Sequence, residues 1–217
     1  FSDKSEIQNG VMYADGEICR VHNGERSVIM HADEIRLPGE HNLLNYLAAF
    51  AAVYGLVGDE NCREVAVHFA GVEHRLEQVR ILRGVTYIND SIGTSPTRTA
   101  AGLRATKTKP IVIVGGYDKH IPFDGLGDDL CQLAKEVILT GATADKIGTA
   151  IENSKYYADS ELKVSHVDDF DDAVHTAASH AVEGDIVLFS PACAAFDRFK
   201  NFAERGRHFK KLIMELE

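Results

Sequence analysis

The sequence has no tryptophan, only four cysteines and no apolar run of about 18 residues, so we expect no membrane-spanning helix. The cysteines form no C-x-x-C pair, which argues against a zinc site or a disulfide framework and favours free thiols in a reducing cytoplasm. Two common phosphate-binding motifs, G-x-G-x-x-G and G-x-x-x-x-G-K-[ST], are also missing. No secretory signal pattern is visible, and the chain starts at Phe1 within a strand-like pattern, so we expect a cytoplasmic fragment of a longer polypeptide.

Basic residues are also scarce, since 23 Lys and Arg face 33 Asp and Glu, for a net charge of −10. This balance argues against broad nucleic-acid binding. The 217 residues are 45% hydrophobic, which is enough for a substantial core in one or two domains.

The first 72 residues carry short alternating runs that are separated by Asn-Gly or Asp-Gly at residues 9–10, 15–16 and 23–24. Such dipeptides are typical of β-hairpin turns. We therefore predict a small β-meander followed by two helices, with strands at Val11–Tyr13, Glu17–His22 and Ser27–His31 and helices at His41–Gly55 and Asn61–Phe69. The passage from Gly71 to Glu73 then resembles a hinge.

From Arg80 onward, apolar strand-like runs alternate with helical segments. The strands are expected at Val85–Asn89, Ile111–Val114, Val137–Thr140, Lys163–His166 and Ile186–Phe189. The helices are expected at Pro96–Ala105, Phe123–Ala134, Thr143–Ser154, Asp169–Glu183 and Arg198–Leu216. Repeated strand–helix units with apolar strands predict an α/β fold, with a doubly wound, Rossmann-like and mostly parallel sheet.

Polar, turn-prone sequences follow three of these strands, at 89–97, 115–120 and 190–202. In a parallel sheet all three lie at the same edge, where ligands of open α/β sheets bind. Turn and capping chemistry alone could explain any single one of these loops. Because there are three at one edge, we favour a binding site. The two glycines at 115–116 followed by Lys119 are only weak evidence for a phosphate site.

The stretch Leu188–Gly206 reads as a strand, a turn of small residues and the start of a helix. We expect Asp197 to cap that helix, and free backbone N–H groups at the turn favour a bound anion. The alternative is that the small residues only pack a tight turn. The basic residues of the last helix, Arg205, Arg207, Lys210 and Lys211, are interpreted as solvated charge.

A few polar residues elsewhere could also bind a ligand. Asn42 and Asn45 open the first helix and could bracket a base, although helix capping explains them as well. His74 and Arg75 lie at the joint between the two regions and could meet a nucleotide or a carboxylate, and Asp90 could accept hydrogen bonds from a ribose. The histidines lack metal-ligand spacing, so we expect no metal site.

Five motifs together resemble the ATP-dependent Mur ligases: Glu40-His-Asn-x-x-Asn45, Glu73-His-Arg-x-Glu77, Asn89-Asp-Ser91, Gly115-Gly-x-x-Lys119 and the long motif from Ser190 to Phe202. The long motif is most similar to family members that add D-glutamate. The resemblance covers nearly the whole chain. It implies that residues 1–72 are the C-terminal part of the central ATPase domain and that 73–217 are the C-terminal, Rossmann-like amino-acid-binding domain.

The resemblance also implies an activity and its partners. ATP would phosphorylate the carboxylate of UDP-N-acetylmuramoyl-L-alanine, and the amine of D-glutamate would attack the acyl phosphate to give an amide. ATP and Mg²⁺ would be held mainly by the part of the enzyme outside this chain, so the fragment alone is expected to be inactive. The resemblance further implies a monomer in peptidoglycan precursor synthesis.

For the amino acid, the resemblance places one carboxylate of D-glutamate at Thr94 and Lys119 and the other at the turn that contains Ala195, Phe196 and Phe202. At the position of Ala195, many members have a serine.

For the nucleotide, the resemblance places Asn42 and Asn45 near the adenine and His74 and Asp90 near the ribose. Arg75 matches a position that helps to dock the last domain, so His74, Arg75 and Lys119 are the expected catalytic residues. Where familiar members read Asp-Ser-Lys-Ala-Thr, this chain has isoleucine at 92 in place of the lysine. Two alternatives stay open: a sister ligase such as a folylpolyglutamate synthase, and a non-catalytic, Rossmann-like module that binds an anionic metabolite.

Overall fold

The computed structural model describes residues 1–37 and 39–217. Backbone contacts divide the chain into two compact units, residues 1–71 and residues 72–217. Each unit has its own hydrophobic core, so each is described by itself. No helix in the described residues is long and apolar enough to cross a membrane.

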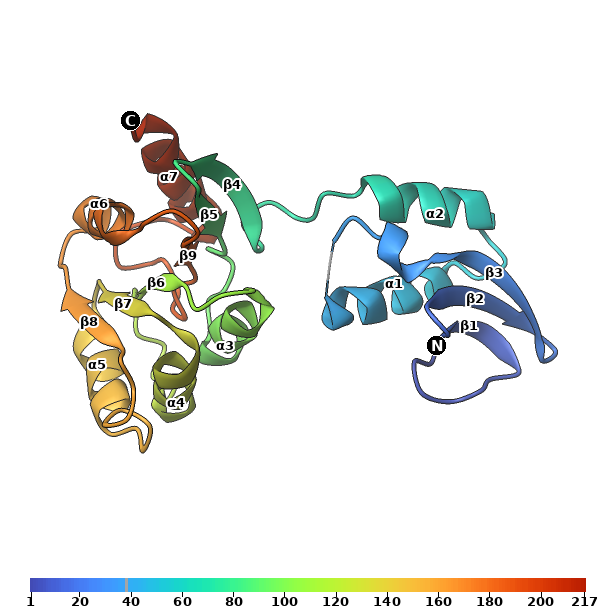
Figure 1. Ribbon diagram of the computed structural model, residues 1–217, viewed down its shortest axis with the longest axis horizontal. Helices are drawn as coiled ribbons and strands as arrows, with labels where there is room; N and C mark the ends of the chain where they lie inside the picture. Colours follow the sequence, from blue (N-terminus) through green and yellow to red (C-terminus); the bar gives the residue numbers. More distant parts are fainter. Residues whose placement is uncertain (38) are drawn as a thin grey trace. The chain divides into compact units, whose positions relative to one another are not determined.

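The first unit is a three-stranded antiparallel sheet with two α-helices packed against it (Figure 1). The predicted meander is confirmed, and its turns at Asp15-Gly16 and Asn23-Gly24 adopt the positive φ that such hairpins need. A short 3₁₀ turn, Ala32–Glu34, follows the sheet. The elements are β1 (Asn9–Ala14), β2 (Glu17–His22), β3 (Glu25–His31), α1 (Glu40–Ala52) and α2 (Asp59–His68).

The second unit is built on a six-stranded sheet in the order β4-β5-β9-β6-β7-β8. All neighbouring pairs are parallel except β4 and β5, which confirms the predicted α/β class and mostly parallel sheet. The strands are β4 (Glu77–Leu82), β5 (Val85–Asn89), β6 (Ile111–Val114), β7 (Glu136–Leu139), β8 (Lys163–His166) and β9 (Ile186–Phe189).

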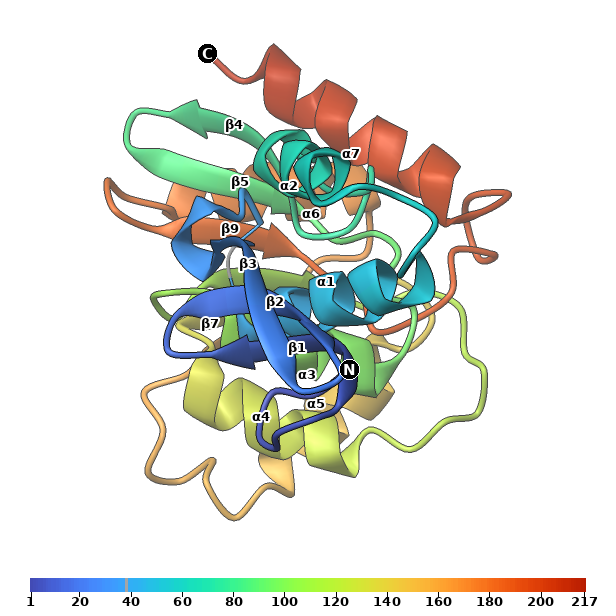
Figure 2. The same ribbon diagram turned by 90° about the vertical axis from the view of Figure 1, so that its right-hand side faces the viewer.

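Helices cover both faces of this sheet (Figures 1 and 2). One face carries α3 (Pro96–Ala105), α4 (Asp124–Leu133) and α5 (Ala144–Glu152), and the other carries α6 (Phe170–His180) and α7 (Phe202–Glu215). Alternate residues of β6 supply the two cores, since Val112 packs on the first face and Ile113 on the second. Burial on both faces is why the strands read as continuous apolar runs.

Two details of the second unit differ from the sequence-based expectations. Strand β4 was not predicted, because its sequence EQVRIL mixes polar and apolar residues at a sheet edge and carries a β-bulge. Helix α7 begins at Phe202 instead of Arg198, and its N-cap is Asn201, whose side chain accepts a hydrogen bond from the Glu204 N–H. The prediction of Asp197 as the cap was therefore wrong.

The strand order positions the candidate site. The chain moves outward from β5 through β6 and β7 to β8 and then returns, so that β9 lies between β5 and β6. The loops that leave β5, β9 and β6 are consequently neighbours at the carboxyl edge of the sheet. A reversal of strand order of this kind creates the crevice in which α/β proteins bind ligands.

Candidate functional site

The three loops at this edge are joined by backbone hydrogen bonds. The Asp90 N–H donates to the Phe189 carbonyl at 2.7 Å, which connects the loop after β5 to the end of β9. The Gly115 N–H donates to the Pro191 carbonyl at 2.9 Å, and the Tyr117 N–H donates to the Ala194 carbonyl at 3.0 Å. The three sequences that were expected at one edge therefore lie together.

Lys119 and Thr94 face each other across two of these loops. The Lys119 ammonium donates to the Thr94 backbone carbonyl, although the two residues are 25 positions apart. Lys119 is exposed and Thr94 is half-buried, so both remain accessible to a ligand. A cation and a hydroxyl at one open position suit a carboxylate or a phosphate.

Phe202, Ala195 and Phe196 come from the third loop and the start of α7. The Ser91 hydroxyl donates to the Phe202 carbonyl at 2.7 Å, which brings the start of α7 against the loop after β5. Ala195 is buried, whereas Phe196 is 63% exposed and packs edge-on against Tyr117, with ring centroids 5.9 Å apart. The structure thus brings Thr94, Lys119 and the 195–202 turn to the same edge.

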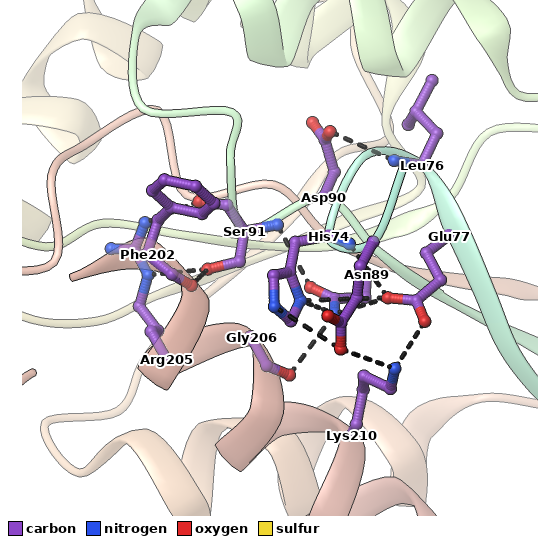
Figure 3. A network of polar contacts seen from close by, with 11 residues as sticks. His74, Leu76, Glu77, Asn89, Asp90, Ser91, Phe202, Arg205, Gly206 and Lys210 are labelled. Carbon is purple, nitrogen blue, oxygen red and sulfur yellow. Dashed lines mark hydrogen bonds and ion pairs between the residues drawn. The ribbon is translucent and has the colours of Figure 1, made fainter. Parts of the chain in front are cut away.

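Arg205 is the buried cation of this edge and is only 2% exposed (Figure 3). Its guanidinium donates to the carbonyls of Ala194 at 2.9 Å and of Cys193 and Ser91, each at 3.0 Å. Its Nε also donates to the Ser91 hydroxyl at 3.2 Å, and the group lies over the Phe189 ring. Burial lowers the pKa of Arg205 to about 10, which leaves it charged at neutral pH.

His74 is enclosed in a polar network beneath the same edge (Figure 3). It is 2% exposed, its ring lies edge-on to Phe202, and a Cβ on Gly206 would stand 2.3 Å from its Nδ1. Asn89 Nδ2 donates to that Nδ1 at 2.9 Å, which places the proton of the neutral ring on Nε2. Burial lowers the pKa of His74, and its Nε2 has no hydrogen-bond partner among the described residues.

The backbone around His74 is held in an uncommon conformation. Both His74 and Leu76 adopt positive φ, 67° and 46°, which non-glycine residues rarely do and which costs free energy. The Glu77 carboxylate accepts from the His74 N–H at 3.0 Å and from Asn89 at 3.2 Å. Arg75, between the two strained residues, is exposed.

Lys210 on α7 closes this network by donating to the carboxylates of Glu73, at 3.1 Å, and Glu77. Glu73, His74 and Glu77 are residues of metal-binding type whose ligand atoms lie within 4.8 Å of one another. Lys210 places one positive charge between these two carboxylates, so the cluster already has a cationic partner from the chain itself.

Asp90 is buried, and both of its carboxylate oxygens are engaged. Oδ1 accepts from the Leu76 N–H at 3.2 Å, and Oδ2 accepts from the Ser190 hydroxyl at 2.7 Å. Burial raises the pKa of Asp90 to about 6, against the opposing effect of these hydrogen bonds. The carboxylate therefore ties the loops after β5 and β9 to the strained 74–76 turn.

The two predicted adenine-side residues belong to the first unit. Asn42 and Asn45 lie in the first two turns of α1, where Asn45 is exposed and Asn42 is half-buried. They are far in sequence from the three loops of the second unit.

Two residues of the network, Arg205 and Lys210, were not anticipated from the sequence, and Asn89 was noted only as part of a motif, without a role. The interpretation of Arg205 as solvated charge was wrong. A signal was present, because Arg205 is three residues after Phe202 and four before Phe209, which puts it on the apolar face of α7. A charged residue on that face implies a buried partner.

Comparison with known proteins gives a family match and several curated relatives. The family described as Mur ligase, glutamate ligase domain, matches residues 74–193. A UDP-N-acetylmuramoylalanine--D-glutamate ligase from Clostridium beijerinckii is 45% identical over 100% of this chain and 46% of its own length. A protein of the same description from Ruminiclostridium cellulolyticum is 42% identical, over 100% of this chain and 47% of its own length. The chain thus spans about half the length of these curated relatives.

Among solved structures, the UDP-N-acetylmuramate-alanine ligase MurC from Thermotoga maritima superposes with a TM-score of 0.62. It is 18% identical and covers 92% of this chain and 43% of its own, a likeness that concerns the fold alone. The family match includes the loops after β5 and β6 and extends into the loop after β9. On this evidence the chain belongs to the Mur ligase family, with the glutamate ligase domain as its second unit.

Proposed function

We propose that this chain is the C-terminal part of an ATP-dependent ligase that adds D-glutamate to UDP-N-acetylmuramoyl-L-alanine. The observation that carries the proposal is the contact of Lys119 with Thr94 at the sheet edge that also holds the 195–202 turn, because it places an exposed ammonium group next to backbone of two other loops. The curated relatives, which are described as D-glutamate ligases, support the choice of amino acid.

In the proposed reaction, ATP converts the carboxylate of the UDP-linked substrate to an acyl phosphate, and the amine of D-glutamate displaces phosphate to form the amide. The role of this chain is to hold the amino acid with its amine aimed at that carbonyl. Lys119 and the Thr94 hydroxyl hold one carboxylate, and backbone N–H groups near Ala195, Phe196 and Phe202 hold the other. Fixing both carboxylates sets the direction of the amine and selects the enantiomer.

On the nucleotide side, we propose that Asn42 and Asn45 contact the adenine and that Asp90 lies near the ribose. The enclosed ring of His74 favours a positioning role, in which it supports the strained turn that carries Arg75. The chain contains no G-x-x-x-x-G-K-[ST] motif, so ATP phosphates and Mg²⁺ are held mainly outside it. Four buried thiols and nucleotide substrates fit a cytoplasmic enzyme, which we expect to be a monomer.

The test is an assay of the full-length enzyme with UDP-N-acetylmuramoyl-L-alanine, ATP and a panel of D- and L-amino acids. We expect phosphate release that depends on D-glutamate and on the UDP-linked substrate together. Turnover with an L-amino acid or with a folate substrate would instead assign the chain to a sister ligase. Lys119→Met should raise the KM for D-glutamate, and Lys155→Met, at a lysine on the surface remote in sequence from the three loops, serves as the control.

A further inference from the structure

Arg205 has an unusual set of partners for a buried arginine. All four of its hydrogen bonds go to uncharged groups, three backbone carbonyls and one hydroxyl. No carboxylate lies within 4.0 Å of it in residues 1–37 and 39–217, where ion pairs with other arginines are found. Burying a charge without a direct ion pair is costly, even with Asp197 near enough to favour the charged form, so the position calls for an explanation beyond stability.

The guanidinium connects all three loops of the site. It donates hydrogen bonds to the carbonyls of Cys193 and Ala194 in the loop after β9. It also donates to the carbonyl and the hydroxyl of Ser91 in the loop after β5. The Ala194 carbonyl also accepts from the Tyr117 N–H, which links the loop after β6 to the same point. One side chain therefore fixes the relative positions of the groups that we assign to the substrate.

The hydrogen bond from Arg205 to the Ala194 carbonyl also determines the direction of the Ala195 N–H. Every peptide bond in the described residues is trans, and in a trans peptide the carbonyl and the following N–H point in opposite directions. The Ala194 carbonyl faces Arg205, so the Ala195 N–H faces away from it. That N–H has no hydrogen-bond partner in the described part of the chain although Ala195 is only 2% exposed, and orphaned buried N–H groups are rare.

We propose that Arg205 is a positioning residue for the amino-acid substrate, which holds the Ala194–Ala195 peptide so that its N–H donates to a carboxylate of that substrate. The positive guanidinium lies behind the carbonyl end of the peptide, so the peptide dipole presents its positive end to the anion. This inference rests on the proposed function and adds to it the element that fixes the carboxylate-binding backbone.

The test uses the full-length enzyme with Arg205→Lys, Arg205→Met and, as a matched control, Arg207→Met, which changes an exposed arginine on the same helix. Lysine keeps the charge but cannot reach three carbonyls with a planar fork. We expect Arg205→Lys to raise the KM for D-glutamate about tenfold or more, with the KM for ATP changed less than about twofold. Arg207→Met should leave both values near those of the wild type.

A second measurement keeps the test decisive if Arg205→Met fails to fold. In ¹⁵N-labelled wild-type enzyme, D-glutamate should shift the amide resonance of Ala195, and in Arg205→Lys that shift should be lost at the same concentration. A wild-type KM for D-glutamate in Arg205→Lys, or an equal rise in KM for all substrates, would overturn the proposal. If the wild type uses another amino acid, the proposed function fails, and the same KM comparison with that amino acid still tests Arg205.

Discussion

Replacing Asp90 with asparagine should remove most of the pH dependence that this residue gives to the stability of the second unit. The pKa of Asp90 is raised from 3.8 to about 6 in the folded state because the carboxyl is buried. The folded protein therefore prefers the protonated form, and this contribution to stability is fully present below about pH 4 and is lost as the pH rises through 6. Asparagine keeps the shape, can accept from the Leu76 N–H and can donate to the Ser190 hydroxyl, but it does not ionise.

The magnitude follows from the shift. A difference of about two pKa units corresponds to about 3 kcal/mol, since one unit is worth about 1.4 kcal/mol. Relative to Asp90→Asn, the wild type should thus lose about 3 kcal/mol of unfolding free energy between about pH 4 and about pH 7. Hydrogen exchange of the buried β6 amides, compared between the two proteins at each pH, measures this difference for the second unit. A difference that stays constant over this range would refute the reasoning.

Three further predictions concern the same unit. Lys210→Met should lower the unfolding free energy because it removes the ion pair with Glu77, and the loss should be only about 1 kcal/mol because that pair is partly exposed and screened by solvent. A melting temperature in low salt that equals that of the wild type would contradict this. Gly115→Ala should prevent normal folding, at a cost above about 4 kcal/mol, because its Cβ would stand 1.7 Å from the Thr140 carbonyl; a wild-type melting curve would exclude this. Cys193, whose pKa is raised to about 11 by burial, should react with iodoacetamide only after unfolding, and peptide mapping that finds it labelled in the folded protein would contradict its burial.

The strands of the second unit could be predicted because burial on both faces leaves a simple signal. Ile111–Val114 and Ile186–Phe189 have the predicted bounds, since each is an apolar run that ends at a glycine or a serine. Strand β4 gave no such signal, because an edge strand that packs on one side tolerates polar residues. The start of α7 was misplaced because Asp197 and Asn201 are both acceptable caps in the sequence, and tertiary contacts of the intervening turn decide between them.

The candidate site also contains residues that could be placed from the sequence and residues that could not. Thr94 and Lys119 could be placed together from the sequence because strand order alone brings their loops to one edge. The residues that support the site could not be predicted in this way, since Asn89, Arg205 and Lys210 each make a contact with a residue more than a hundred positions away. Long-range contacts of this kind leave only indirect traces, such as a charge on the apolar face of a helix.

The position of β9 has a consequence for how the protein is made. This strand lies in the middle of the sheet, yet it is the last of the six to leave the ribosome. A nascent chain that ends before residue 186 has β5 and β6 but not the strand that joins them, so the sheet stays in two pieces until β9 has been made. Pairing strands about a hundred residues apart is slow, and the exposed edges of β5 and β6 are open to wrong partners in that interval. We therefore expect this half of the molecule to be the part that depends most on chaperones during translation.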